Sequence, residues 1–293
     1  HICQCVNGLP LGILLAAGWT NLLTATEIAE TIMDGKGSKG LEFFATGGQD
    51  MPERHRDIES VFCQSWNMIS GKQQETLATL AFLPSSFSIE TAKTIAQADL
   101  ADLKVLLDHS LLERKPSGRL QMHDLLRQYA SSQGVDVHGV YERTRDYYSA
   151  KVMQWEKALK NEKQLQAVDE INLEIANLNA IWDEIITNGD FNYANQMFDG
   201  MCLYLSWRHH YVEAIAFCGN FVRKLEEKQT ITDTFSIQDA YRLLAKALTW
   251  QASFLKLDEA GTSLVRSMEI LDDPVLEGCD IRSERAFTSY WMA

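Results

Sequence analysis

The hydrophobic pattern changes character along the chain, and its last part is the most regular. After about Gly139, amphipathic stretches with apolar residues at helical spacing follow one another. They cover residues 142–160, 170–188, 191–207, 211–228, 236–255 and 258–271. Short polar turns such as Asn188-Gly189-Asp190 separate them. Helices joined by short turns are typical of an α-solenoid, so we expect a helical repeat domain over residues 136–293.

The kind of repeat is indicated best near the end of the chain. From Tyr241 onward the spacing of small and apolar residues resembles the tetratricopeptide (TPR) pattern, although Gln251 replaces its usual aromatic residue. The positions that fit are Leu244, Ala247, Leu248, Ala260 and Leu264. We therefore expect degenerate, TPR-like repeats. The tryptophans expected in the core between their helices are Trp182, Trp207 and Trp250.

The middle of the chain, residues 51–135, combines short helices with one hairpin. Ser88 is expected to cap a helix that continues to Ala98, and the leucine spacing after Leu100 predicts another helix that ends near His109. The segments 111–114 and 119–122 flank Lys115-Pro116-Ser117-Gly118, whose residue types predict the turn of a β-hairpin. Helices followed by a two-stranded ribbon are the outline of a winged helix. A further helix is expected from His123.

Residues 1–50 predict two helices. Gly8, Leu9 and Pro10 open a nearly all-apolar helix, and proline is favoured in a first helical turn. Thr24 and Glu27 have the spacing of a capping box for the second helix.

The glycine-rich segment that follows, residues 34–40, lacks the pattern of a phosphate-binding loop. Glu30 stands where a Walker sequence has its first glycine, and Gly37 stands where it has Ser or Thr. A chain without the phosphate cradle and the Mg²⁺-holding hydroxyl does not hydrolyse ATP by this route. We therefore expect no enzymatic activity from this chain and no metal site.

Composition and charge exclude several functional classes. The 293 residues contain 27 Lys and Arg against 40 Asp and Glu, which gives a net charge of −13, and such a charge repels nucleic acid and anionic lipid. The longest apolar run, Leu9–Trp19, is shorter than the roughly 20 residues that span a bilayer. Six scattered cysteines without a C-x-x-C pair favour reduced thiols. We expect a cytoplasmic protein, and His1 suggests a start inside a longer one.

Three short sequence strings indicate a family resemblance that the hydrophobic periodicity alone does not reveal. Gly8-Leu9-Pro10-Leu11 opens the first helix, and Met122-His123-Asp124-Leu125-Leu126 follows the hairpin. Glu170-Ile171-Asn172-Leu173 lies at the start of the repeats. In this order the strings resemble the signal-transduction ATPases with numerous domains (the STAND or NB-ARC-like class), in particular its bacterial transcriptional regulators. The resemblance covers nearly the whole chain, although each string is short.

This resemblance implies a layout. Residues 1–50 would be the end of a helical domain, 51–135 a winged helix and 136–293 a sensor built of TPR-like repeats, all behind an upstream P-loop domain. The repeats would bind an inducer or a protein partner, and activation would lead to oligomerisation.

The resemblance also implies a nucleotide site. ADP or ATP, held by the upstream P-loop domain, would contact Gly8, Leu9 and Pro10, with the Pro10 ring against the adenine. His123 would contact the ADP β-phosphate and lock the inactive state, and Asp124 would cap the helix that follows.

Two other interpretations are open. The repeats could form a stand-alone TPR-like interaction scaffold without nucleotide, whose acidic surface favours a basic partner. The winged helix could instead bind DNA, although the helix that would enter the groove carries Asp99, Asp102 and Asp108 against Lys104 alone. The small basic cluster on the hairpin is expected to be a solvated turn, and it consists of Arg114, Lys115 and Arg119.

Overall fold

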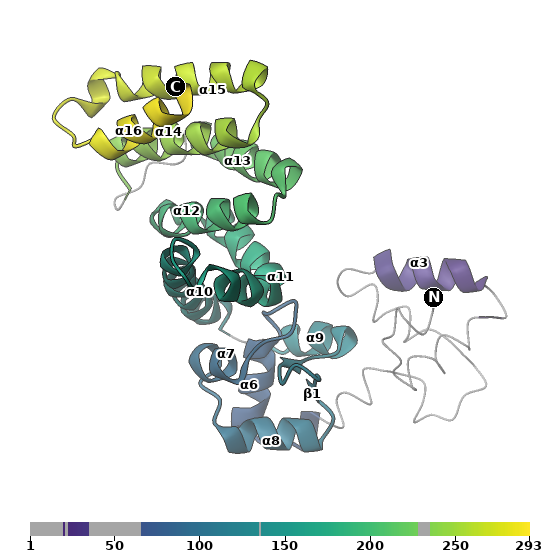
Figure 1. The fold of residues 1–293 in the computed structure, drawn as a ribbon. Helices are drawn as coiled ribbons and strands as arrows, with labels where there is room; N and C mark the ends of the chain where they lie inside the picture. The colour runs from purple at the N-terminus through teal and green to yellow at the C-terminus, as the bar shows by residue number, and fades with distance from the viewer. Residues whose placement is uncertain (1–19, 21–22, 35–65, 135, 228–234) are drawn as a thin grey trace. The chain divides into compact units, whose positions relative to one another are not determined.

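The computed structural model divides the chain into two compact units, residues 1–144 and 145–293 (Figure 1). The residues it describes are 20, 23–34, 66–134, 136–227 and 235–293. These residues are mostly helical and contain one two-stranded sheet. No helix among them is both long and apolar enough to cross a membrane. The expectations for Gly8, Leu9 and Pro10 lie outside the described residues, as does the glycine-rich loop after Asp34.

Helix α3 (Ala25–Asp34) begins with the capping box that the sequence predicts. The Thr24 N–H donates to Glu27 Oε2 at 2.8 Å, and the Glu27 N–H donates to Thr24 Oγ1 at 3.3 Å. These bonds satisfy amides that a helix start leaves unpaired. The Thr24 N–H, together with the Thr24 hydroxyl that also donates to Glu27 Oε2, lowers the pKa of Glu27, because both stabilise its charged form.

In residues 66–134, three helices precede the hairpin and one follows it. They are α6 (Gly71–Leu80), α7 (Ile89–Ile95), α8 (Leu100–Asp108) and, after strands β1 (Glu113–Arg114) and β2 (Leu120–Gln121), α9 (Asp124–Ser131). The strands pair antiparallel, with Glu113 opposite Gln121, so the predicted hairpin is confirmed. Phe87 adds an extended segment between α6 and α7, because its N–H and C=O both bond to Leu120 at 2.8 Å.

Polar residues determine where α7 and α8 begin. The Ser88 hydroxyl accepts from the Thr91 N–H at 2.9 Å, and the Asp99 carboxylate accepts from the Asp102 N–H at 2.8 Å. The predicted cap at Ser88 is therefore confirmed. Helix α7 ends at Ile95, earlier than expected, because Gln97 has a φ of 52° that a right-handed helix does not accommodate.

The apolar faces of these helices meet beside the hairpin. The apolar residues that are at most 1% exposed there are Leu77, Leu80, Leu83, Phe87, Ala92, Ile95, Leu106, Leu120, Met122 and Ala130. Arg119 is also buried, and it donates to Ser86 Oγ at 2.9 Å and to the Ser86 carbonyl at 2.5 Å. The expectation of a solvated turn is therefore wrong for Arg119, which ties the hairpin to the segment before Phe87.

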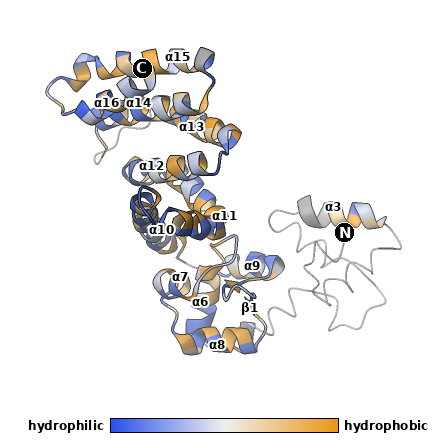
Figure 2. Cartoon of the chain, in the orientation of Figure 1, coloured by the Kyte–Doolittle hydropathy of each residue, from blue (hydrophilic) through white to orange (hydrophobic). Residues whose placement is uncertain are grey.

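The second unit is a succession of helices, most of which pack against the next helix in sequence (Figure 1). They are the later part of α10 (Val137–Leu159), then α11 (Gln164–Asn188), α12 (Phe191–Trp207), α13 (Tyr211–Glu226), α14 (Ile237–Phe254), α15 (Leu257–Leu271), the short 3₁₀ helix η3 (Pro274–Leu276) and α16 (Arg282–Met292). Figure 2 shows hydrophobic and hydrophilic residues along each of these α-helices, as one-sided burial requires. The expected run of amphipathic helices is confirmed, and α16 is an addition to it.

Aromatic rings fill the space between α11, α12 and α13. The Trp182 ring lies 4.8 Å from the Phe217 ring and 5.1 Å from the Phe221 ring, measured between centroids. Trp182 and Trp250 are buried, as expected. Trp207 is half exposed, which contradicts the expectation of a core position, because it is the last residue of α12 and lies at the end of the packed face.

Three buried hydroxyl groups join α14, α15 and α16. Thr249 Oγ1 lies 3.0 Å from Ser267 Oγ and 2.8 Å from Thr288 Oγ1. All three residues are at most 1% exposed, so each hydroxyl needs a partner inside the protein. This shared cluster fixes α16 against the two helices before it.

We predict opposite effects for two glycine-to-alanine changes in helices. At Gly200 in α12, a Cβ atom would lie 2.6 Å from Val152 Cγ1 and 3.2 Å from the Val152 carbonyl oxygen, whereas at Gly261 in α15 nothing lies within 4 Å. Gly200→Ala should lower the free energy of unfolding by about 1–2 kcal/mol through overpacking, and Gly261→Ala should raise it by about 0.5–1 kcal/mol. Urea denaturation measures both. An equal gain in stability for the two variants would contradict the close packing of α10 on α12.

Candidate functional site

The structure describes two of the five site residues that the resemblance implies, and they adjoin where the hairpin ends. His123 is half-buried between β2 and α9, and its carbonyl accepts from the Arg127 N–H at 2.9 Å. Asp124 is the first residue of α9, so its carboxylate lies inside the first turn and not at the expected capping position. A carboxylate there still stabilises the helix, because it faces the positive end of the helix dipole.

Arg127 bonds to the residues on both sides of His123. Its Nη1 donates to Asp124 Oδ1 at 2.7 Å, and its Nη2 donates to the Met122 carbonyl at 3.1 Å. Burial lowers the pKa of Arg127, with the Asp124 carboxylate acting in the opposite sense, and the guanidinium stays charged at neutral pH. The two bonds restrain the backbone that carries the His123 ring.

Acidic groups lie at the start of α8, the helix that would enter a DNA groove. Lys72 Nζ lies 2.8 Å from Asp99 Oδ2 and 2.6 Å from Asp102 Oδ2. The Lys72 ammonium, helped by backbone N–H groups, lowers the pKa of Asp99 to about 2, so this carboxylate is ionised at neutral pH. Ionised carboxylates repel phosphate, and Lys72 is bonded to the acids, so the geometry gives the DNA interpretation no support.

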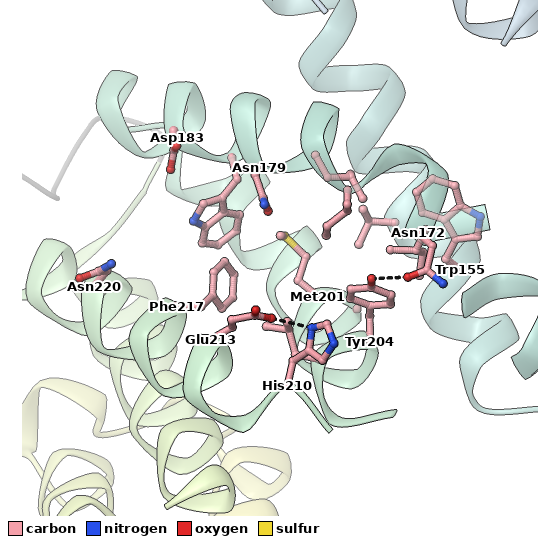
Figure 3. A pocket seen from close by; sticks show the side chains of 17 residues that line it. Trp155, Asn172, Asn179, Asp183, Met201, Tyr204, His210, Glu213, Phe217 and Asn220 are labelled. Carbon is pink, nitrogen blue, oxygen red and sulfur yellow. Dashed lines mark hydrogen bonds and ion pairs between the residues drawn. The ribbon is translucent and has the colours of Figure 1, made fainter. Parts of the chain in front are cut away.

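A second candidate site is a cavity of about 590 Å³ in the second unit (Figure 3). Side chains from α10, α11, α12 and α13, together with His210 between α12 and α13, form its wall. The wall is aromatic and aliphatic over most of its area, and its ring-bearing residues are Trp155, Trp182, Tyr204, His210 and Phe217. This volume lies within the range of cavities that bind small molecules.

A buried carboxylate joins α10 to α11 beside this cavity. Glu174, 6% exposed, accepts from the Tyr148 hydroxyl at 2.7 Å and from Asn177 Nδ2 at 2.9 Å. Burial, together with the Glu174 charge, raises the pKa of Tyr148 well above its ordinary value, so the phenol remains a donor. Glu174 therefore has the donors that a buried carboxylate requires.

Neighbouring residues of the string that carried the family resemblance make similar bonds. Glu170 Oε2 accepts from Trp155 Nε1 at 2.7 Å, and Asn172 Oδ1 accepts from the Tyr204 hydroxyl at 2.6 Å (Figure 3). The string thus bonds α11 to α10 on one side and to α12 on the other. Trp155, Asn172 and Tyr204 also line the cavity, so the same bonds shape its wall.

Polar groups lie among the aromatic ones. His210 Nδ1 lies 2.5 Å from Glu213 Oε2, and Figure 3 shows this pair beside Phe217. Partial burial raises the pKa of Asp183. Within the described ranges, no group of three or more His, Cys, Asp or Glu side chains is placed to hold a metal ion.

Sequence reasoning missed the cavity, although one signal was present. Asn172, Asn179 and Asp183 are seven and four residues apart, which places them on one face of α11. Such a polar row beside the buried Trp182 is unusual for a helix that only packs against others. That combination could have indicated a polar-lined hollow.

We predict that Glu174→Ala destabilises the second unit strongly. The change leaves the Tyr148 hydroxyl and the Asn177 amide without their acceptor in a buried place, at a cost of about 2–4 kcal/mol. Glu184→Ala, on the exposed side of the same helix, should change stability by less than about 0.5 kcal/mol. Urea denaturation of the two variants measures the difference.

A double-mutant cycle adds the decisive control for Glu174. If its bond to Tyr148 matters, the loss from Glu174→Ala should be smaller in a Tyr148→Phe background, because the hydroxyl that would be left without a partner is already gone. A Glu174→Ala variant as stable as the parent, or losses that simply add, would contradict this assignment.

Comparison with known proteins extends these observations. No protein-family model matches the sequence. The chain is 23% identical over 268 residues to a "Putative HTH-type transcriptional regulator" of Mycobacterium bovis, and equally to proteins of the same description in two strains of Mycobacterium tuberculosis. Each alignment covers 86% of this chain and 29% of the relative, so the chain spans less than a third of the relatives' length.

A similar solved structure is that of a Signal Transduction ATPase with Numerous Domains (STAND) protein with a tetratricopeptide repeat sensor, from Pyrococcus horikoshii. The TM-score is 0.37 at 14% identity, over 97% of this chain and 44% of that one. The curated relatives are described as transcriptional regulators, which is the kind of bacterial protein that the three short strings indicated.

Proposed function

We propose that this chain is the regulatory and sensor part of a STAND-type signalling switch and has no catalytic activity of its own. The observation that carries the proposal is the setting of His123, between the hairpin and α9, with Arg127 bonded to the residues on either side of it. The resemblance assigns this position to a histidine that contacts ADP. A restrained backbone there suits a residue that must meet a phosphate in one geometry.

The surrounding elements are proposed to form a winged helix. Their order supports it: helix α6, the extended segment at Phe87, helices α7 and α8, then the hairpin β1–β2. The bonds of Phe87 to Leu120 supply the third extended segment beside the hairpin. In this proposal the winged helix serves nucleotide-dependent closure and does not read DNA.

The nucleotide is proposed to be ADP in the resting state, exchanged for ATP on activation. An upstream P-loop domain would hold the phosphates, and Gly8, Leu9 and Pro10 would contact the nucleotide from the helical domain. His123 would donate to the β-phosphate near the start of α9, where helix amides favour anions.

The repeats are proposed to be TPR-like and to bind the inducer or a protein partner. Binding changes the state of a switch only when the ligand has a higher affinity for one state than for the other. The cavity between α10, α11, α12 and α13 supplies a place for such a ligand within the repeats. Oligomerisation would follow when the open state is favoured.

A second candidate function is a TPR-like scaffold that binds a partner without any nucleotide. The cavity and the net charge of −13 are compatible with it. The two candidates differ in one observable, because only the switch requires ADP to stabilise a longer protein that includes the P-loop domain.

We predict that His123→Ala accelerates ADP release from that longer protein. Loss of a charge-assisted hydrogen bond to phosphate is worth about 1.5–3 kcal/mol, so the dissociation rate should rise by about ten- to a hundredfold. The rate is measured by displacing a fluorescent ADP analogue with excess unlabelled ADP. His138→Ala is the matched control, because His138 is exposed on α10.

Retention of ADP by His123→Ala as long as by the parent would refute the proposed role of His123. Equal acceleration by His138→Ala would indicate a general loss of stability. Circular dichroism of both variants shows whether each is folded.

A further inference from the structure

The cavity of the second unit has a carboxylate, Asp183, for which the described part of the chain provides no Lys or Arg partner. Asp183 lies on α11 beside Trp182, and partial burial is the cause of its raised pKa, with no contribution from a nearby Lys or Arg. Among the described residues that line the cavity, none is Lys or Arg. At the rim, Arg223 is bonded to Asn220, and the charge of Arg208 acts on the Tyr204 hydroxyl. Among the described residues, Asp183 is therefore a carboxylate of the lining that forms no ion pair with a Lys or Arg of the lining.

In a second cavity of this unit, acidic side chains of the lining form ion pairs with basic side chains of the lining. This cavity has a volume of about 570 Å³ and is lined mainly by α12, α14 and α16. There Lys246 lies 3.1 Å from Asp199, and Arg242 lies 2.6 Å from Glu284. Two acids of its lining are thus paired with two of its bases.

Aromatic faces adjoin the uncompensated carboxylate. The Trp182 and Phe217 rings both line the cavity, and their centroids are 4.8 Å apart. Figure 3 shows Asp183 and Phe217 on the same side of the hollow. Aromatic faces attract cations as well as apolar groups, and tryptophan does so most strongly. A carboxylate and two such rings together favour a ligand that carries both features.

We infer that this cavity binds a small organic cation, an amine or guanidine joined to an aromatic or branched apolar body. The cationic group would lie beside Asp183 and the body against Trp182 and Phe217. This inference rests on the proposed sensor function and names the chemical class of its inducer. An anion would meet the charges of Asp183 and Glu213, and a neutral molecule would leave Asp183 partly desolvated without compensation.

The test uses the 293-residue chain and three probes of nearly equal size and different charge. They are 2-phenylethylammonium, 2-phenylethanol and phenylacetate, each titrated by isothermal calorimetry at low salt. We expect the ammonium to bind with a dissociation constant of about a millimolar, since molecules of this size reach about −4 kcal/mol. It should bind about three- to tenfold more tightly than the alcohol, with phenylacetate weaker still.

Two variants locate the effect. Asp183→Asn should abolish the preference for the ammonium over the alcohol, whereas the neighbouring Glu184→Gln, which does not line the cavity, should preserve it. Both residues are exposed, so neither change threatens folding. Equal affinity for the three probes, no binding of the ammonium at 10 mM (roughly ten times the expected dissociation constant), or an unchanged preference in Asp183→Asn would each overturn the inference.

The outcome separates this inference from the proposed function. If the cavity binds the ammonium with the expected preference but the ammonium leaves the ADP affinity of the longer protein unchanged, the binding site is supported and its role as a sensor is refuted. If none of the probes binds and His123→Ala still accelerates ADP release, the proposed switch function is supported and the inferred class of ligand is wrong.

Discussion

The buried carboxylate of Glu174 is the constraint on which the arrangement of α10, α11 and α12 depends. A charge with 6% of its residue exposed is tolerated only because Tyr148 and Asn177 donate to it. The Tyr148 bond joins α10 to α11, and Asn177 supplies the second donor from α11 itself. On the same helix, Glu170 meets Trp155, and Asn172 meets Tyr204. A short acidic string thereby sets the positions of the residues that surround the cavity.

Each unit carries one half of the proposed switch. In the first unit, Arg127 restrains the backbone around His123 through bonds to both neighbouring residues. In the second unit, α10, α11, α12 and α13 enclose a cavity whose lining includes Asp183, Trp182 and Phe217. A ligand-controlled switch requires two sites and two states that the ligand distinguishes, and we propose His123 and the cavity as parts of those two sites.

Local chemistry explains which elements could be predicted from the sequence. The bounds of α12 agree with the expected 191–207, because Gly189 and His209, with φ values of 75° and 55°, interrupt the helices on either side. The caps at Thr24 and Ser88 could also be predicted from local sequence, because each cap bond joins residues only three positions apart. The strings that contain His123 and Asn172 indicated the class of protein, but not the hydrogen bonds that these residues and their neighbours make.

Features that depend on tertiary contacts were missed. Trp207 and Trp182 look alike in sequence, yet Trp207 lies at a helix end and is half exposed. Arg119 resembles a solvated hairpin residue until Ser86, far away in sequence, provides two acceptors. The cavity needs four helices at once, so no single segment predicts it. Helix α16 is mostly polar and is held by Thr288, which bonds to hydroxyls of two other helices.

The central claim, that this chain belongs to a nucleotide-controlled switch, is tested most directly by the nucleotide content of the longer protein. That protein would be purified without added nucleotide and denatured, and the released nucleotide would be identified by ion-exchange chromatography. Our account predicts ADP in a ratio of about one per chain, as for a single site that retains its ligand through purification. Recovery of no nucleotide from a folded protein that contains the P-loop domain would contradict it.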